Sequence, residues 1–307
     1  MAGKQKADWR SQYPFESNLI ELEESVRMHY VDESPTTLNH PSKSESTSAS
    51  PGETFLCVHG NPTWSFYYRS LIKRFRGQHR VVAVDHIGCG ISDKPQKYDY
   101  TLAQHRDNLV RLIDHLNLAN VTLVAHDWGG AIGLASVLER SDRFKRIVLL
   151  NTGAFPPPYV PYRIAACRIP LLGTFAMRQL NAFARAAITM AVDKRPLDTD
   201  AALGLLAPYD NWRNRVAING FVQDIPMSPR HPTHSVLRDI ESRLPTLAPM
   251  PVHLVWGMKD WCFRPECLER FEKIWPHATA TRLDDCGHYV IEDDPESVLD
   301  SIQDVIA

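Results

Sequence analysis

The chain has 307 residues, of which 44% are hydrophobic and 23% are charged, as in an ordinary globular protein. Its net charge of −2 gives no electrostatic case for binding nucleic acid or an anionic membrane. The apolar runs are shorter than the ~18 residues that span a bilayer, and no apolar stretch follows the polar first residues. We therefore expect a cytoplasmic protein without an integral membrane segment. Its six cysteines form no CxxC pair and are expected to stay reduced.

The predicted elements begin with a hairpin. Two short stretches of alternating hydrophobicity, at residues 18–22 and 25–31, predict antiparallel strands. Residues 39–53 are polar and rich in serine, so they cannot bury a core and predict a mobile surface loop.

Strands and helices then alternate. Apolar runs predict strands at residues 55–58, 81–84, 121–125 and 147–150. Residues 62–75 predict a helix with Asn61 at its N-cap and Pro62 at its first position. Helical spacing predicts further helices at residues 102–116 and directly after Asp127. Strands that are apolar on both faces belong to a parallel sheet covered by helices, so we expect an α/β fold.

The alternation stops at residues 155–247 and resumes with predicted strands at 252–255 and 280–283. The intervening segment is rich in Ala, Pro, Arg and aromatic residues, with helical patches at residues 181–192 and 211–221. An insertion at the functional edge of a sheet is typical of a lid. We expect a core domain of residues 1–154 and 248–307, ending in a helix from about Pro295, and a helical cap of residues 155–247.

Asp127 narrows the chemistry more than any other residue. It follows an apolar strand and precedes Gly129 and Gly130, a pattern typical of the strained elbow that presents a nucleophile. A carboxylate alkylated at an sp3 carbon becomes an ester that water can cleave, whereas an alkylated serine would be an ether. Aspartate here predicts displacement at saturated carbon, with halide, epoxide oxygen or lactone oxygen leaving. The alternative is an aspartate that only caps the next helix.

Two loops after later strands carry candidate partners for Asp127. His288 follows the last predicted strand and is suited to activate water, and Asp260 follows the preceding strand and is suited to orient that imidazole. The strand at 147–150 ends in Asn151 rather than a carboxylate, which favours Asp260 as the acid. The alternatives are a structural histidine and an aspartate that makes a local turn.

Asn61 and Trp128 are candidates for stabilising the leaving group. Their backbone N–H groups predict an oxyanion hole, and the Asn61 amide with the Trp128 indole N–H is suited to bind a departing halide. The alternatives are helix capping for Asn61, which is compatible with that role, and packing for Trp128.

Four motifs in combination resemble the haloalkane dehalogenase branch of the α/β-hydrolases over nearly the whole chain. They are residues 59–64 (His-Gly-Asn-Pro-Thr-Trp), 85–95, 126–130 (His-Asp-Trp-Gly-Gly) and 287–288 (Gly-His). The resemblance implies the α/β-hydrolase fold, with a mostly parallel central sheet flanked by helices and an inserted helical lid. Asp260 combined with Asn61 resembles the third subgroup, which is similar to the β-lactone decarboxylases of bacterial olefin biosynthesis. The lid segments at residues 151–155, 208–212 and 221–226 resemble the same group.

The leading interpretation is therefore haloalkane dehalogenation. Asp127 would displace the halide, Asn61 and Trp128 would hold it, and His288 with Asp260 would activate water against the resulting ester. This chemistry requires no metal or organic cofactor, and the expected ligands are a small apolar haloalkane and the halide ion. β-Lactone decarboxylation by the same residues is the main alternative.

Two further functions remain open. Epoxide hydrolysis requires phenol donors, for which Tyr159, Tyr162 and Tyr209 are available, but Asn61 after His59-Gly60 argues against it. A ligand-binding protein without activity is disfavoured by the intact set of acid, base and nucleophile. Aromatic residues of the lid are candidate pocket liners, since the lid sets substrate size: Phe155, Phe175, Phe183, Trp212 and Phe221. Apolar lid surface also leaves open a homo-oligomer or contact with partner enzymes.

Overall fold

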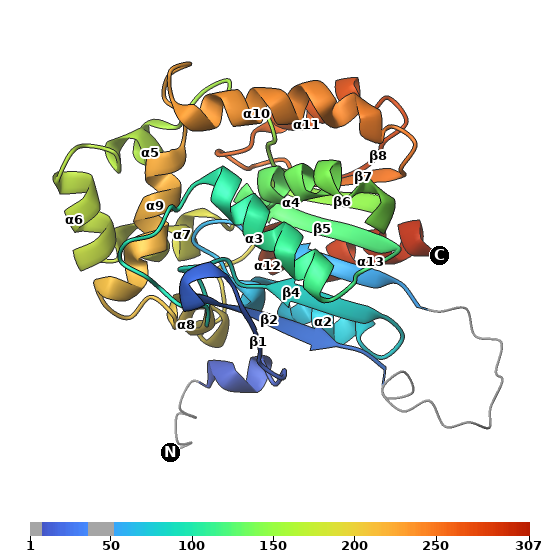
Figure 1. Ribbon diagram of the computed structural model, residues 1–307, viewed down its shortest axis with the longest axis horizontal. Coiled ribbons are helices and arrows are strands. Elements are labelled where there is room, and N and C mark those ends of the chain that lie inside the picture. Colours follow the sequence, from blue (N-terminus) through green and yellow to red (C-terminus); the bar gives the residue numbers. More distant parts are fainter. Residues whose placement is uncertain (1–7, 36–51) are drawn as a thin grey trace.

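The computed structural model describes residues 8–35 and 52–307, so most of the loop predicted at 39–53 lies outside the described residues. Eight strands of the described chain form one sheet, in the order β1-β2-β4-β3-β5-β6-β7-β8 (Figure 1). The pairs β1–β2 and β2–β4 are antiparallel, whereas all pairs among β3 to β8 are parallel. The predicted hairpin and the mostly parallel sheet are confirmed.

The strands are β1 (Asn18–Glu21), β2 (Arg27–Glu33), β3 (Thr54–Val58), β4 (Arg80–Val84), β5 (Val121–Asp127), β6 (Phe144–Thr152), β7 (Val252–Gly257) and β8 (Thr279–Leu283). The helices outside the β6–β7 connection are α2 (Arg69–Phe75), α3 (Leu102–His115), α4 (Trp128–Glu139), α11 (Pro265–Ile274), α12 (Val290–Asp293) and α13 (Pro295–Ile306). Short 3-10 helices are η1 (Trp9–Gln12), η2 (Glu23–Ser25), η3 (Ser65–Tyr68), η4 (Ser141–Arg143), η5 (Arg213–Arg215) and η6 (Leu244–Leu247).

Helices bury both faces of the sheet. Successive side chains of a strand point to opposite faces, so Leu56 of β3 packs in one core cluster and Phe55 and Cys57 in the other. The first cluster joins the sheet to α3, α4, α10 and α11, and the second joins it to α2, α12 and α13. This two-sided burial explains why the strands read as continuous apolar runs in the sequence.

The helix predicted at residues 62–75 begins later than expected. The Asn61–Pro62 peptide is cis, the chain becomes helical only at η3, and α2 starts at Arg69. The prediction that Asn61 caps this helix is therefore wrong. The backbone N–H of Asn61 is instead bonded to the carboxylate of Asp127, a tertiary contact that holds the chain away from the helix.

The connection between β6 and β7 is helical, as predicted. It contains α5 (Tyr162–Ala166), α6 (Leu172–Gln179), α7 (Ala182–Met190), α8 (Thr199–Leu206), α9 (Val216–Asp224) and α10 (Pro232–Arg243). In Figure 1, α5 and α6 lie at the outer edge of the molecule, on the side opposite the C-terminus. α10 returns to the sheet, where Leu237 and Ile240 join the core cluster under α3 and α4.

Two further expectations concern the whole chain. All six cysteines are free thiols, as predicted. Every helix of residues 8–35 and 52–307 is too short or too polar to cross a membrane.

We predict that Gly129→Ala destabilises the fold. A Cβ at Gly129 would lie 2.0 Å from the carbonyl oxygen of Val58, so α4 would have to move away from β3. The free energy of unfolding is expected to fall by about 3 kcal/mol. Urea denaturation measures this, with Gly77→Ala as the matched control because a Cβ there meets no atom within 4 Å. Equal stability of the two variants would contradict the close approach of α4 and β3.

Candidate active site

Asp127 lies at the elbow between β5 and α4. Its φ of 53° and ψ of −130° are strained for a residue with a side chain, and that strain persists only where the surroundings enforce it. The hydroxyl of Thr152 donates to the Asp127 carbonyl, and a Cβ at Gly60 would lie 2.0 Å from the Asp127 Oδ1 atom. The side chain makes no capping hydrogen bond to α4, so the simple capping alternative is not what the geometry shows.

The carboxylate of Asp127 is buried, with 6% of the residue exposed. Its Oδ1 accepts the backbone N–H of Asn61 at 2.6 Å, and its Oδ2 lies 3.6 Å from Nε2 of His288. Burial raises the pKa of Asp127, while the charge of His288 and the backbone N–H groups of Trp128 and Asn61 oppose that rise. The carboxylate therefore faces two fixed amide donors and one imidazole.

His288 connects Asp127 to a second carboxylate. Its Nδ1 is 2.8 Å from Oδ2 of Asp260, which is 2% exposed. Burial lowers the pKa of His288, but the charge and hydrogen bond of Asp260 and the charge of Asp127 outweigh it and raise that pKa above its ordinary value. The geometry is that of a base held by an acid next to a nucleophile.

Asn151 occupies the end of β6, where the sequence lacked a carboxylate. Its Nδ2 donates to Oδ2 of Asp260 at 3.0 Å and its Oδ1 accepts the N–H of Gly257 at 2.8 Å. The backbone N–H of Cys262 donates to the other oxygen of Asp260 at 2.6 Å. Together with Nδ1 of His288, these two groups give the carboxyl of Asp260 three hydrogen-bond partners.

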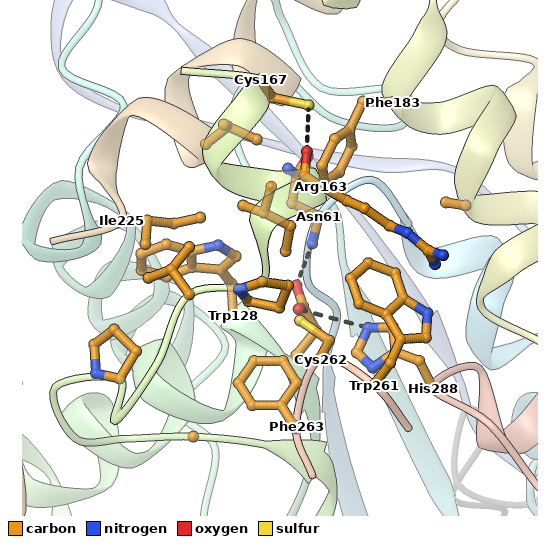
Figure 2. Close-up of a pocket in the computed structure, with 18 of the residues that line it drawn as sticks. Asn61, Trp128, Arg163, Cys167, Phe183, Ile225, Trp261, Cys262, Phe263 and His288 are labelled. Atoms are coloured by element: carbon orange, nitrogen blue, oxygen red, sulfur yellow. Dashed lines mark hydrogen bonds and ion pairs between the residues drawn. The ribbon is translucent and has the colours of Figure 1, made fainter. Parts of the chain in front are cut away.

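Asn61 and Trp128 lie on the same pocket as the carboxylate. Figure 2 shows Trp128 and His288 on opposite sides of the point where the dashed lines from Asn61 and His288 meet. The Asn61 Nδ2 is 3.4 Å from the carbonyl of Ile218, a long contact that a bound anion can replace. The structure therefore brings together all five residues that the sequence singled out for chemistry.

The pocket has a volume of about 570 Å³ and is mostly apolar. Asp127, His288 and Asn61 form its polar end, and the rest of the wall comes largely from the β6–β7 connection. Its apolar lining includes Ile164, Cys167, Met177, Phe183, Met190 and Ile225. Such a site fits an alkyl ligand that has one polar reacting group.

The predicted aromatic liners are partly wrong. Phe155 and Phe183 line the pocket. Phe175 is exposed because α6 turns Ala176 and Met177 to the pocket instead. Trp212 is also exposed, under the Arg178 guanidinium, and Phe221 is buried behind Trp128, with ring centroids 5.7 Å apart.

Residues that follow the acid and the histidine were missed. Trp261, Phe263 and Tyr289 line the pocket. Their positions in the sequence could have indicated that they line the pocket, because each lies within three residues of Asp260 or His288.

The three tyrosines considered for epoxide opening are not free donors at this site. Tyr159 lines the pocket, but its hydroxyl donates to the carbonyls of Trp261 and Cys262. Tyr209 is buried and donates to the carbonyl of Thr63, and Tyr162 is exposed. The geometry gives epoxide hydrolysis no support. Among the described residues, no three His, Cys, Asp or Glu side chains are grouped as metal ligands.

Comparison with known proteins defines the family. A family model described as the alpha/beta hydrolase fold matches residues 53–295, so the chain belongs to that family. It is 42% identical over 258 residues to the cis-3-alkyl-4-alkyloxetan-2-one decarboxylase of Shewanella oneidensis, covering 82% of this chain and 81% of the relative. It is 30% identical over 298 residues to haloalkane dehalogenase 2 of Mycobacterium bovis, covering 94% of each.

A solved structure agrees with these relatives. The tetrameric haloalkane dehalogenase DpaA from Paraglaciecola agarilytica matches with a TM-score of 0.74 and 27% identity, covering 94% of this chain and 92% of that one. The chain is thus an enzyme of the α/β-hydrolase branch that holds haloalkane dehalogenases and β-lactone decarboxylases. The resemblance stated from the sequence motifs is confirmed.

We predict that Asp260→Asn lowers the pKa of His288. The charge of Asp260 raises that pKa against burial, so without the charge burial prevails and the pKa falls below about 6.5. NMR titration of the His288 ring measures the shift. Asp285→Asn, an exposed aspartate in the loop that carries His288, is the control and should leave the pKa unchanged. If the pKa of His288 is the same in Asp260→Asn as in the parent chain, Asp260 is not the residue that raises it.

Proposed function

We propose that the chain decarboxylates cis-3-alkyl-4-alkyloxetan-2-ones, with Asp127 as a covalent nucleophile. The observation that carries the proposal is the 42% identity to a decarboxylase of this kind, against 30% to a haloalkane dehalogenase. The apolar pocket with one polar end supports it, because the substrate has two alkyl chains on a small polar ring. The sequence alone favoured dehalogenation, and the relatives favour the alternative that it left open.

In the first step, a carboxylate oxygen of Asp127 attacks C4 of the lactone, the sp3 carbon that bears the ring oxygen. The C4–O bond breaks with inversion, and its electron pair leaves on the ring oxygen, which becomes part of a free carboxylate. The side-chain N–H groups of Asn61 and Trp128 are suited to stabilise that developing charge. The product is an alkyl ester of Asp127.

In the second step, the new carboxylate leaves as carbon dioxide. The C3–C2 electron pair forms the C3=C4 double bond, and the C4–O bond to Asp127 breaks, which regenerates the nucleophile. Inversion followed by anti elimination converts the cis lactone into a cis alkene. The two steps balance without water or a net proton, so the lactone is the only reactant.

His288 has a different task in this reaction than in hydrolysis. Against burial, the charge and hydrogen bond of Asp260 raise the pKa of His288. A protonated ring 3.6 Å from Asp127 would make the carboxylate a better leaving group in the second step. In dehalogenation the neutral ring would instead remove a proton from water. The triad of Asp127, His288 and Asp260 therefore serves both reactions with the proton on different atoms.

Dehalogenation is the second candidate function. Asn61 and Trp128 line the pocket beside Asp127, and both side chains carry an N–H group of the kind that suits a departing halide. Water activated by His288 would then hydrolyse the alkyl ester, with an alcohol, a halide ion and a proton as products.

The cap and the assembly belong to the same proposal. Residues 155–247 supply most of the pocket wall, so we assign them as a cap whose small residues, such as Ala182 and Ala186, set the length of the alkyl chains accepted. Self-association is supported by the tetrameric relative DpaA.

We predict that the purified chain converts a synthetic cis-3,4-dialkyloxetan-2-one into the cis alkene and carbon dioxide. Gas chromatography with mass detection measures the alkene. Asp127→Asn should lose at least about 1,000-fold in rate, because an amide is not a nucleophile at sp3 carbon. Asp285→Asn should keep the rate of the parent chain. A β-hydroxy acid in place of the alkene would contradict the proposal, since it would mean that water ends the reaction before carbon dioxide is lost.

We predict that His288→Gln separates the two candidate functions. With 1-bromobutane, bromide release should stop after one equivalent per chain, and intact mass spectrometry should find one butyl group on Asp127, because the ester is no longer hydrolysed. With the lactone, turnover should slow but continue, since the second step uses no water. Absence of bromide release from the unaltered chain would exclude dehalogenation. Complete loss of lactone turnover in His288→Gln would contradict the water-free second step.

A further inference from the structure

The segment from residue 162 to residue 180, which contains α5 and α6, exposes several large apolar side chains. This cap patch consists of Tyr162, Ile169, Leu171, Leu172, Phe175 and Leu180. Leu171 and Leu172 are 87% and 62% exposed. α6, which carries Leu172 and Phe175, lies at the edge of the molecule opposite the C-terminus (Figure 1). Grouped exposure of this kind marks an interaction site more often than a solvated surface.

Leu171 is unfavourably placed for a residue that faces water. Its φ of 62° lies in the left-handed region, which costs a side-chain-bearing residue about 1 kcal/mol. The strained backbone directs an apolar side chain outward at the start of α6, rather than into the pocket that the same helix lines through Ala176 and Met177. The conformation is productive only where something apolar covers the side chain.

The segment of the chain that carries the cap patch has charged residues of one sign. Residues 155–192 contain Arg163, Arg168, Arg178 and Arg185 and no Asp or Glu, although the chain as a whole has a net charge of −2. Arg168 donates to the backbone carbonyls of Val222, Gln223 and Ile225, and the carboxylate of Asp224 is the acidic group whose charge acts on it. Arg185 is exposed. The small net charge of the whole chain therefore does not reflect the local charge of residues 155–192, which is basic.

We propose that the cap patch docks on an anionic lipid surface, with its leucines in the acyl boundary and its arginines at the headgroups. Apolar side chains flanked by basic residues without acidic ones bind such surfaces by burial and by charge attraction together. A second copy of the chain is a poor occupant, because a two-fold contact would bring the four arginines against four others. This proposal departs from the expectation drawn from the net charge of the whole chain, because it depends on the local distribution of charge.

The cap patch lies on the same segment of the chain that lines the pocket, so docking would bring the pocket close to the lipid. That segment lines the pocket with Ile164, Cys167 and Met177 and exposes the residues of the patch. A lipophilic substrate dissolved in the bilayer would reach the pocket without crossing water. This route rests on the proposed function, whereas the docking itself does not.

Co-sedimentation with vesicles tests the docking. The full chain should bind vesicles of phosphatidylcholine with phosphatidylglycerol much more than vesicles of phosphatidylcholine alone, and added salt should weaken that binding. Leu171→Ser/Leu172→Ser should reduce the partition coefficient by about tenfold or more, because two leucines no longer enter the acyl boundary. Leu19→Ser/Leu203→Ser, at two other leucines that are 50% and 43% exposed, is the matched control and should bind as the parent does.

Three results would overturn the proposal: no binding to either vesicle, equal binding by the Leu171→Ser/Leu172→Ser variant, or a change of oligomeric state in that variant without vesicle binding. The last result, seen by light scattering, would assign the patch to contact between copies. Asp127→Asn should bind vesicles like the parent chain, so failure of the catalytic proposal and failure of the docking are separate outcomes.

Discussion

The hydrogen bond from the Asn61 backbone to the Asp127 carboxylate is the constraint on which the site depends. It joins the end of β3 to the end of β5, and it requires that Asp127 stay in a strained conformation with φ positive. Glycine at positions 60 and 129 is what allows the strands and α4 to approach so closely. Once the elbow is fixed, the loops after β7 and β8 need only supply Asp260 and His288 at the same edge.

Much of the fold could be predicted because its signals are local. Apolar runs located β3 to β6, the resumed alternation located β7 and β8, and two glycines after Asp127 located the elbow. The prediction that Asn61 caps a helix was wrong because its contact with Asp127, 66 positions away in the sequence, overrides the local preference for a helix. The prediction that Phe175 and Trp212 line the pocket was wrong for a similar reason. Which side of a short helix faces a pocket is decided by how the helix docks, and composition carries no record of that.

The reaction itself was the hardest feature to predict. Displacement at sp3 carbon follows from a carboxylate at the elbow, but the departing group is chosen by partners that both reactions share. Asn61, Trp128 and His288 suit a halide and a lactone oxygen equally, so relatives carry more weight than residue types at this point. The role of Asn151 is the feature that the structure adds most clearly. The sequence showed only that this position has no carboxylate, whereas the structure shows that its side-chain amide donates to Asp260.

The unequal polarity of the pocket has a kinetic consequence. In the proposed mechanism, the alkyl ester on Asp127 would have two fates, fragmentation to an alkene or attack by water, and the faster one would set the product. The wall beyond Asn61, Asp127 and His288 is mostly apolar and offers few positions where a water molecule would be held. Scarcity of water lengthens the lifetime of the ester and lets fragmentation run first. A single polar substitution among the apolar liners would then shift the branching ratio toward the β-hydroxy acid, without any change to the nucleophile.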